Sequence, residues 1–542
     1  MLDLWYKNAV IYCLDVGTFM DSNGDGVGDF QGLADRLDHI EALGCTCVWL
    51  LPFYPSPNRD NGYDVTDYYN VHPCHGTLGD FVAFTKAAED RGLRVIVDLV
   101  VNHTSIDHPW FQEARKGRDN PFHDWYVWKD EKPADAHEGV VFPGEQDAVW
   151  TYDDQAKRWY FHRFYDHQPD LNIANPAVKE EIDKIMGFWL QLGVSGFRVD
   201  AVPFLLEYKG LEPHEHPEQD EHHYLTELRT FLSWRRAHAI LLGEANIPMD
   251  QVDDYFGRGD RMHMIFNFPL NQNLFLALAR GEAEPVKAVM RGTPKIPKSA
   301  QWGSFLRNHD ELDLGRLPDA ERHECFAAFG PDPCMQLFDR GIRRRLAPML
   351  QDPRRIKMAY SLMFALPGTP VLWYGEEIGM GDELSLKGRD AVRTPMQWDG
   401  DPNAGFSTAP PDRLVRPVVR EGEYAYEKVN VAAQRDRPDS LLEHVERVVR
   451  ARRSCPEVGW GDATILPCDE DSVLGLRYDW RGNTVVLLHN LADREVSVPT
   501  DGDGKLIPLC SSEDIDEPLA AGAYLRLGPY GFAWLRARGE RR

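Results

Sequence analysis

Three carboxylic acid side chains each follow a short apolar segment that is typical of a β-strand. Asp200 directly follows Gly196-Phe197-Arg198-Val199, Glu244 follows Leu241-Leu242-Gly243, and Asp310 comes shortly after Phe305-Leu306. Two carboxyl groups about 5 to 5.5 Å apart can cleave a glycosidic bond with retention, since one acts as nucleophile and the other as proton donor. A lone acid at a strand end is more often a cap or an ion-pair partner, but three in the same context favour catalysis.

The elements that must gather these acids read as repeated βα units from residue 8 to about 455. We expect eight strands: Ala9–Val16, Thr46–Leu51, Leu93–Leu99, Gly196–Asp200, Ala239–Glu244, Met262–Phe266, Trp302–Leu306 and Pro370–Tyr374. The helical segments between them include Leu33–Leu43, Leu78–Arg91, Val178–Leu192, Tyr224–Trp234, Leu270–Ala279 and Arg355–Phe364. The predicted fold class is α/β, a (β/α)8 TIM barrel, because that fold places catalytic groups at the carboxyl ends of its strands.

Two regions do not fit the βα repeat. Residues 104–172 are rich in Trp, Tyr, His and Asp and are too long for a simple connection, so we expect a lid subdomain inserted after the third strand. Residues 455–542 alternate in the manner of an antiparallel β-sandwich, with strands at Ser472–Tyr478, Thr484–Asn490 and Tyr524–Leu527. The catalytic barrel would then comprise residues 1–103 and 173–454.

Composition excludes several classes of protein. A formal charge of -26 disfavours nucleic acid and anionic membranes as partners, since both require a basic surface. The 9 cysteines have no regular spacing, which favours reduced thiols over disulfides or a metal knuckle. No basic, then apolar leader and no long apolar run is present, so we expect a cytoplasmic protein. The 60 Trp, Tyr and Phe residues would mostly pack the core, and some could line a sugar site.

Six segments resemble the conserved regions of the α-amylase family of glycoside hydrolases and transglycosylases, and they occur in family order. They are Asp98-Leu99-Val100-Val101-Asn102-His103, Gln168-Pro169-Asp170-Leu171-Asn172, Gly196-Phe197-Arg198-Val199-Asp200, Gly243-Glu244-Ala245-Asn246, Asn308-His309-Asp310 and Gly368-Thr369-Pro370-Val371-Leu372-Trp373-Tyr374-Gly375-Glu376-Glu377. The resemblance covers nearly the whole chain and is highly specific.

The resemblance implies a role for each acid. Asp200 would be the nucleophile, Glu244 the general acid/base, and Asp310 the carboxylate that grips sugar hydroxyls and stabilises the transition state. The residues agree with this, because Arg198 lies two positions before Asp200 on the same side of a strand and can keep the nucleophile ionised. Glu244 must stay protonated and so needs a raised pKa.

Further positions match sugar-binding residues of the family. His103 and His309 resemble its hydroxyl-binding histidines, and Tyr63 would stack on the first glucose unit. Asp60 and Arg393 resemble the pair that closes the far end of that glucose site in exo-acting members, so polymers would be poor substrates. The predicted substrate-binding set is Asp60, Tyr63, His103, Phe164, Arg198, His309 and Arg393.

The segment from Asp21 to Asp29 spaces oxygen-bearing residues at alternate positions with glycine at the sixth, like the start of a calcium loop. Position twelve is Gly32, so the bidentate glutamate of an EF-hand is missing, and an Asx-rich turn is the alternative. The resemblance favours a structural Ca2+ or Mg2+ and implies no organic cofactor. The implied ligands are Asp21, Asn23, Asp25, the carbonyl of Val27 and Asp29, with Asn102 and Asp170 at a second calcium position of some relatives.

Longer stretches resemble the trehalose synthases of this family, which interconvert maltose and trehalose. Such stretches include Trp49-Leu50-Leu51-Pro52-Phe53-Tyr54-Pro55-Ser56-Pro57 and Arg343-Arg344-Arg345-Leu346-Ala347-Pro348. Arg163 and Glu311 resemble residues whose ion pairs close the pocket in those enzymes. The chain departs from them at Gly315, where a glutamate is usual, and in the loop at residues 207–214.

Three functions remain open at this stage. The first is a maltose–trehalose isomerase, and the second is an exo-acting α-glucosidase or α-glucosyltransferase, which the two departures favour because a leakier lid admits water or outside acceptors. The third is a non-catalytic relative of amino-acid transport subunits, which the intact trio disfavours. The expected partner is a small α-glucoside such as maltose or trehalose, and the sequence leaves open whether the protein is a homo-oligomer.

Overall fold

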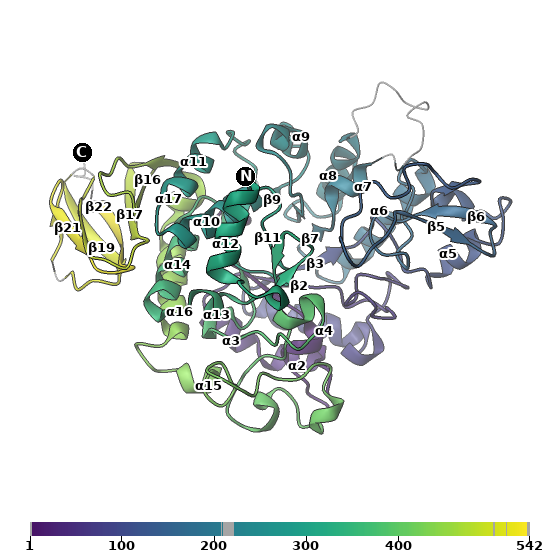
Figure 1. Cartoon of the computed structure of the whole chain (residues 1–542), viewed down its shortest axis with the longest axis horizontal. Helices are drawn as coiled ribbons and strands as arrows, with labels where there is room; N and C mark the ends of the chain where they lie inside the picture. Colours follow the sequence, from purple (N-terminus) through teal and green to yellow (C-terminus); the bar gives the residue numbers. More distant parts are fainter. Residues whose placement is uncertain (1–2, 208, 210–221, 502–503, 516, 539–542) are drawn as a thin grey trace.

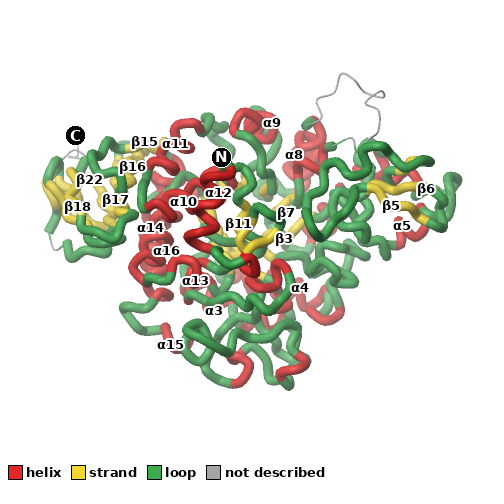
Figure 2. The backbone as a smooth tube through the Cα atoms, viewed as in Figure 1, coloured by secondary structure: helices red, strands yellow, loops and turns green. Residues whose placement is uncertain are grey.

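The computed structural model describes residues 3–207, 209, 222–501, 504–515 and 517–538. Eight parallel strands form a closed barrel in the order β1-β14-β10-β9-β8-β7-β3-β2, at the centre of the molecule in Figures 1 and 2. They are β1 (Ile11–Leu14), β2 (Cys47–Leu50), β3 (Arg94–Leu99), β7 (Gly196–Val199), β8 (Ile240–Gly243), β9 (Met264–Phe266), β10 (Gln301–Phe305) and β14 (Thr369–Trp373). All eight expected strands and the TIM-barrel fold class are confirmed.

The strands are short and buried, apart from the half-buried Arg94 that begins β3, as expected for a barrel whose inner face is packed with side chains and whose outer face is covered by helices. Parallel pairing brings their carboxyl ends to one rim. The register of β3 and β7 sets Asp98 opposite Arg198, so an acid and a base from separate strands face each other inside the barrel.

Helices surround the barrel (Figure 2). Those of eight residues or more in this layer are α4 (Leu78–Asp90), α6 (Pro176–Gln191), α8 (His223–Arg235), α10 (Phe268–Arg280), α11 (Glu284–Gly292), α12 (Asp319–Phe329), α14 (Pro353–Ala365) and α16 (Leu441–Ser454). Shorter ones are α1 (Val16–Phe19), α2 (Phe30–Asp35), α3 (Leu37–Ala42), α7 (Val202–Leu206), α9 (Val252–Phe256), α13 (Leu346–Leu350), α15 (Val431–Gln434) and α17 (Pro456–Trp460). Helix α4 begins with a capping box, in which the side chains of Thr77 and Asp80 each accept a hydrogen bond from the other's backbone N–H.

One predicted helix is wrong in detail. Leu33–Leu43 was expected to form a single helix, but the chain forms α2 and α3, which meet at Arg36 with φ −107° and ψ 6°. Apolar periodicity runs through both pieces because each packs Leu33 or Leu37 into the same core, so the pattern does not reveal the break.

The segment between β3 and α6 carries α5 (Pro109–Ala114) and a small antiparallel sheet in the order β4-β6-β5, at one end of the molecule in Figure 1. Its strands are β4 (Trp128–Lys129), β5 (Trp150–Asp153) and β6 (Arg158–Phe161). A second small sheet follows the barrel strand β10, with β11 (Leu312–Asp313), β12 (Gln336–Leu337) and β13 (Gly341–Ile342). Loops of the inserted segment at residues 139–142 and 163–164, together with Asp313 of β11 and Arg340 just before β13, line the pocket described below.

The C-terminal region consists of antiparallel sheets at the opposite end of the molecule (Figure 1). Six strands are ordered β15-β16-β17-β22-β19-β20, and β18 pairs with β21. They are β15 (Asp462–Ile465), β16 (Val473–Trp480), β17 (Asn483–Asn490), β18 (Val496–Pro499), β19 (Lys505–Ser511), β20 (Leu519–Ala520), β21 (Tyr524–Leu527) and β22 (Phe532–Arg538). Ser361 of α14 contacts both His489 and Trp534 at 2.9 Å, which fastens this region to the barrel layer.

Within the described residues, no helix is both long and apolar enough to cross a bilayer. The nine cysteines are all unpaired, and five of them are buried. This agrees with the expectation of reduced, mostly buried thiols.

Candidate active site

A single buried guanidinium group joins the two proposed reacting carboxylates. Arg198 on β7 is 2% exposed, and its Nη1 lies 2.5 Å from Asp200 and 2.9 Å from Asp98. Its Nη2 lies 2.9 Å from an oxygen of Glu244. Because Asp200 and Glu244 follow the ends of β7 and β8, which are neighbours in the barrel, the fold brings both acids to the same cation.

The turn after Asp200 has a strained backbone that lets it donate a hydrogen bond to Glu244. Ala201 has φ 48° and ψ 43°, a left-handed conformation that costs energy for a residue with a Cβ. In this conformation its N–H donates to Glu244 Oε2 at 3.2 Å. The strained turn therefore fixes the position of Glu244 relative to Asp200.

Glu244 has the electrostatic character of a proton donor. Burial raises the pKa of its carboxyl group to about 7, and the negative charges of Asp200 and Asp310 act in the same direction against Arg198. A carboxyl group with that pKa is protonated in a large fraction of molecules at neutral pH, as a general acid requires.

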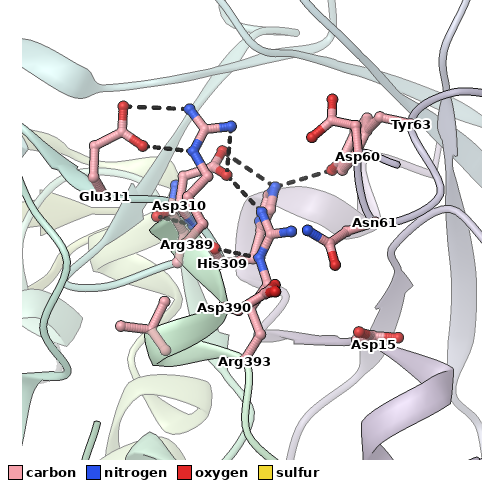
Figure 3. A network of polar contacts seen from close by, with 12 residues as sticks. Asp15, Asp60, Asn61, Tyr63, His309, Asp310, Glu311, Arg389, Asp390 and Arg393 are labelled. Carbon is pink, nitrogen blue, oxygen red and sulfur yellow. Dashed lines mark hydrogen bonds and ion pairs between the residues drawn. The ribbon is translucent and has the colours of Figure 1, made fainter. Parts of the chain in front are cut away.

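The carboxyl group of Asp310, in contrast to that of Glu244, is held in its ionised form. It accepts from Arg393 Nη2 at 2.8 Å and Arg389 Nη1 at 3.1 Å, as Figure 3 shows. Burial alone would raise the pKa of this carboxyl group, but the charges of Arg389 and Arg393 keep it below its usual value. Asp310 is therefore an ionised acceptor beside the two other acids, which suits the gripping of sugar hydroxyls.

All three acids face one cavity of about 760 Å³. Its walls come from the barrel rim, from residues 139–142 and 163–164 of the inserted segment, and from residues near β11 and β13. The predicted sugar-binding residues Asp60, Tyr63, His103, Phe164 and Arg198 line it as well. This volume lies within the range of about 300 to 1,000 Å³ that is usual for small-molecule sites. Aromatic and polar side chains line the cavity together, as sugar binding requires.

The two predicted sugar-binding histidines pack against Tyr63 and Phe164, the aromatic side chains that line the cavity. His309 is buried beneath Tyr63, with the rings nearly parallel and the centroids 6.0 Å apart, and its Nε2 lies 2.9 Å from the Tyr63 hydroxyl. His103 donates from Nε2 to the Tyr63 carbonyl at 3.1 Å and packs its ring edgewise on Phe164. Burial lowers the pKa of both histidines, so each is a neutral hydrogen-bonding group.

Asp60 and Arg393, which are expected to close the far end of the first glucose site, have separate partners. Arg393 donates to the His309 carbonyl at 2.7 Å and to Asp310, while Asp60 accepts from Gln168 at 2.8 Å. Among the described residues no direct ion pair joins Asp60 to Arg393. The guanidinium of Arg393 is paired with Asp310. Burial raises the pKa of Asp60 to about 7.

Each of the two predicted gating residues forms an ion pair of its own. Arg163 forms an ion pair with Glu207, and Glu311 accepts from Arg389 Nε at 2.6 Å. Glu311 and Arg163 both line the cavity. Of the altered loop at residues 207–214, only Glu207 and Lys209 lie within the described residues.

Sequence reasoning missed Arg389, which contacts Asp310 and Glu311 together (Figure 3). Its guanidinium also lies over the rings of Phe142 and Phe338, at 5.2 and 5.6 Å. It lies between the sixth matched region, which ends at Glu377, and Arg393, and its place four residues before Arg393 was the only signal in the sequence.

In the first proposed metal loop the carboxylate of Asp21 accepts hydrogen bonds from the backbone of the same loop. Asp21 accepts from the N–H groups of Asn23, Gly24 and Gly26 and from the Ser407 hydroxyl. Within the described chain no group of three His, Cys, Asp or Glu residues is arranged to hold a metal ion. The hydrogen bonds describe the Asx-rich turn, and a cation bound by Asp21, Asn23, Asp25, Val27 and Asp29 stays a prediction.

The second proposed metal position holds a lysine ammonium group in place of a metal ion. The ammonium group of Lys209 lies between Asn102 and Asp170, with Nζ 2.9 Å from Asn102 Oδ1 and 3.0 Å from Asp170 Oδ2. The oxygens expected to bind calcium therefore accept from a lysine of this chain.

A closed parallel barrel that brings two carboxyl groups on one arginine and a third, ionised carboxylate to a sugar-sized cavity is the architecture of an enzyme that acts on glycosides. The profile of the family described as "Alpha amylase, catalytic domain" matches residues 16–322 and 343–461. The chain belongs to the α-amylase family.

Three curated relatives show different degrees of similarity to this chain. A "Trehalose synthase" of Thermus thermophilus is 45% identical over 536 residues, which are 98% of this chain and 55% of that protein. A "Trehalose synthase" of Pimelobacter sp. is 41% identical, covering 98% of this chain and 96% of that one. An "Oligo-1,6-glucosidase" of Heyndrickxia coagulans is 29% identical, covering 94% and 96%. The chain thus spans about half of the Thermus protein but nearly all of the other two.

Solved structures show the same architecture. The trehalulose synthase MutB from Pseudomonas mesoacidophila superposes with a TM-score of 0.77 at 28% identity, covering 98% of this chain and 99% of that one. An α-amylase from H. orenii gives a TM-score of 0.80 at 26% identity, covering 98% and 100%.

Proposed function

We propose that this protein is a trehalose synthase that interconverts maltose and trehalose by intramolecular glucosyl transfer with retention. Asp200 attacks the anomeric carbon while Glu244 protonates the departing oxygen, which leaves a glucosyl group on Asp200 and a free glucose in the pocket. Glu244 then takes the proton of the anomeric hydroxyl of that glucose, whose oxygen attacks the same carbon and releases the carboxylate of Asp200. The observation that carries the proposal is the shared guanidinium of Arg198, which holds the carboxylates of Asp200 and Glu244 beside one cavity. The similarity to trehalose synthases supports the choice of substrate.

Isomerisation requires that the freed glucose stays in the pocket and that water stays out. The wall between the inserted segment and the barrel supports this. Arg163 is paired with Glu207, and Arg340 donates to the Val141 carbonyl at 2.8 Å. Each contact ties the inserted segment to a later part of the chain across the cavity.

Gly315 favours the second candidate, an exo-acting α-glucosidase or α-glucosyltransferase, since a side chain is missing from the cavity wall there. The space is nevertheless filled, because a Cβ on Gly315 would come within 2.9 Å of both Arg340 and Asp313. Arg316 beside it donates to Asn246 Oδ1 at 2.7 Å. These contacts offset the missing glutamate, so the isomerase is the better-supported function.

Incubation with maltose and free 13C-glucose tests the proposal. The isomerase should give mainly unlabelled trehalose, because the glucose released inside the pocket is recaptured before it exchanges. Mainly free glucose would show a hydrolase, and labelled disaccharide an intermolecular glucosyltransferase, and either result would replace the proposal. An Asp200→Asn variant prepared in parallel reports activity from contaminating enzymes.

The pH dependence follows from Glu244, which must carry its proton when the glycosidic oxygen departs. Its pKa is raised to about 7, so the active protonated form dominates below that pH and is lost above it. We expect kcat/KM on maltose to fall about tenfold per pH unit on the alkaline side, with an apparent pKa near 7. A rate that stays constant well into the alkaline range, in protein shown to remain folded, would contradict this role.

A further inference from the structure

Lys209 occupies a cage of oxygens between the barrel and the inserted segment. Its Nζ donates to Asn102 Oδ1 at 2.9 Å, to the carbonyls of Asn102 and Leu171 at 3.1 Å each, and is 3.0 Å from Asp170 Oδ2. Asn102 follows the barrel strand β3, while Asp170 and Leu171 belong to the end of the inserted segment. One ammonium group therefore joins three parts of the chain.

The size of the cage fits an ammonium ion. Oxygens at 2.9 to 3.1 Å are at normal hydrogen-bond distance from a nitrogen donor. Calcium ligands lie at about 2.3 to 2.6 Å, and magnesium ligands are closer still. The side chains of Lys209 and Asp170 are 2% and 0% exposed, so the pair is shielded from solvent ions.

The cage is adjacent to the cavity wall. Asp170 also accepts from the Arg163 N–H at 2.9 Å, and Asn102 precedes His103 in the chain. Arg163 in turn pairs with Glu207, two residues before Lys209. The position of the lysine thus affects both sides of the sugar pocket.

We propose that Lys209 is a built-in replacement for the divalent cation at this junction, so that the inserted segment is held on the barrel without calcium at this position. The single charge of the ammonium group balances the single charge of Asp170, and its donors satisfy the two carbonyls. Lys209 is a positioning residue and does not touch the substrate.

Removal of the side chain should convert the junction into a calcium-dependent one. Lys209→Ala leaves Asp170 buried without a counter-charge, and we expect its melting temperature in chelator to fall by roughly 2–5 °C. Added calcium should restore much of that loss in Lys209→Ala and raise the bound calcium by one ion per chain relative to the unaltered protein. Lys209→Met should show the loss without the rescue, because its side chain still fills the cage.

The comparison is made between variants, so calcium bound at the Asp21 loop contributes equally to all of them. Lys184→Ala removes an exposed lysine and serves as the matched control. An unchanged melting temperature in Lys209→Ala, or an equal response to calcium in the unaltered protein and in Lys209→Ala, would overturn the proposal. If Lys209→Ala does not fold in chelator, refolding only with calcium supports it, and failure under both conditions counts against it.

Discussion

Replacement of Asp200 by asparagine should lower kcat on maltose by at least roughly 10⁴-fold, because the amide cannot form the glucosyl-enzyme bond. The change keeps the size of the side chain and an oxygen that can accept from Arg198, which lies 2.5 Å from the carboxylate. The fold should therefore survive, and circular dichroism and the melting temperature would show this. Initial rates of product formation measure the loss.

The matched control is Asp166→Asn, which removes an exposed acid of the inserted segment whose side chain is 72% accessible. It should retain nearly all activity. Activity within tenfold of the unaltered protein in Asp200→Asn would mean that another group attacks the sugar.

Replacement of Glu244 by glutamine should produce a loss that depends on the leaving group. For maltose, whose departing sugar oxygen needs a proton, we expect a fall of roughly 10² to 10⁴-fold in kcat/KM. For an aryl α-glucoside with an acidic phenol the first step needs little protonation, so its rate should fall far less. The alkaline decline assigned to Glu244 should also disappear in the variant.

Burst kinetics with the aryl α-glucoside would measure this difference, and added azide should yield an α-glucosyl azide because it needs no general base. Equal losses on maltose and on the aryl α-glucoside would show that Glu244 does not act as the acid. The 3.2 Å bond from the Ala201 N–H can be kept by the glutamine carbonyl, so the geometry of the site is a fair comparison.

The barrel could be predicted because each strand is a short apolar segment followed by a polar or turn residue. The strand ends also predicted which acids meet, since Asp200 and Glu244 follow neighbouring parallel strands. The break at Arg36 could not be predicted, because it depends on one backbone conformation within a continuous apolar pattern.

The partners of charged side chains were predicted less well. The chain offers several arginines near Asp310, and only the folded rim shows that Arg389 and Arg393 both reach it. Asp60 and Arg393 were expected to close one end of the glucose site together, and the sequence did not show that Gln168 and Asp310 are their respective partners. The lysine between Asn102 and Asp170 comes from a loop with no motif, so sequence alone suggested a metal there.

Trapping of the glucosyl-enzyme intermediate tests most directly whether Asp200, Glu244 and Asp310 surround one anomeric carbon. The protein would be treated with 5-fluoro-α-D-glucosyl fluoride, digested and analysed by tandem mass spectrometry. Our account predicts one fluoroglucosyl group per chain, carried by Asp200, with protection by maltose. A label on a different side chain, or complete inactivation with Asp200 unmodified, would contradict it.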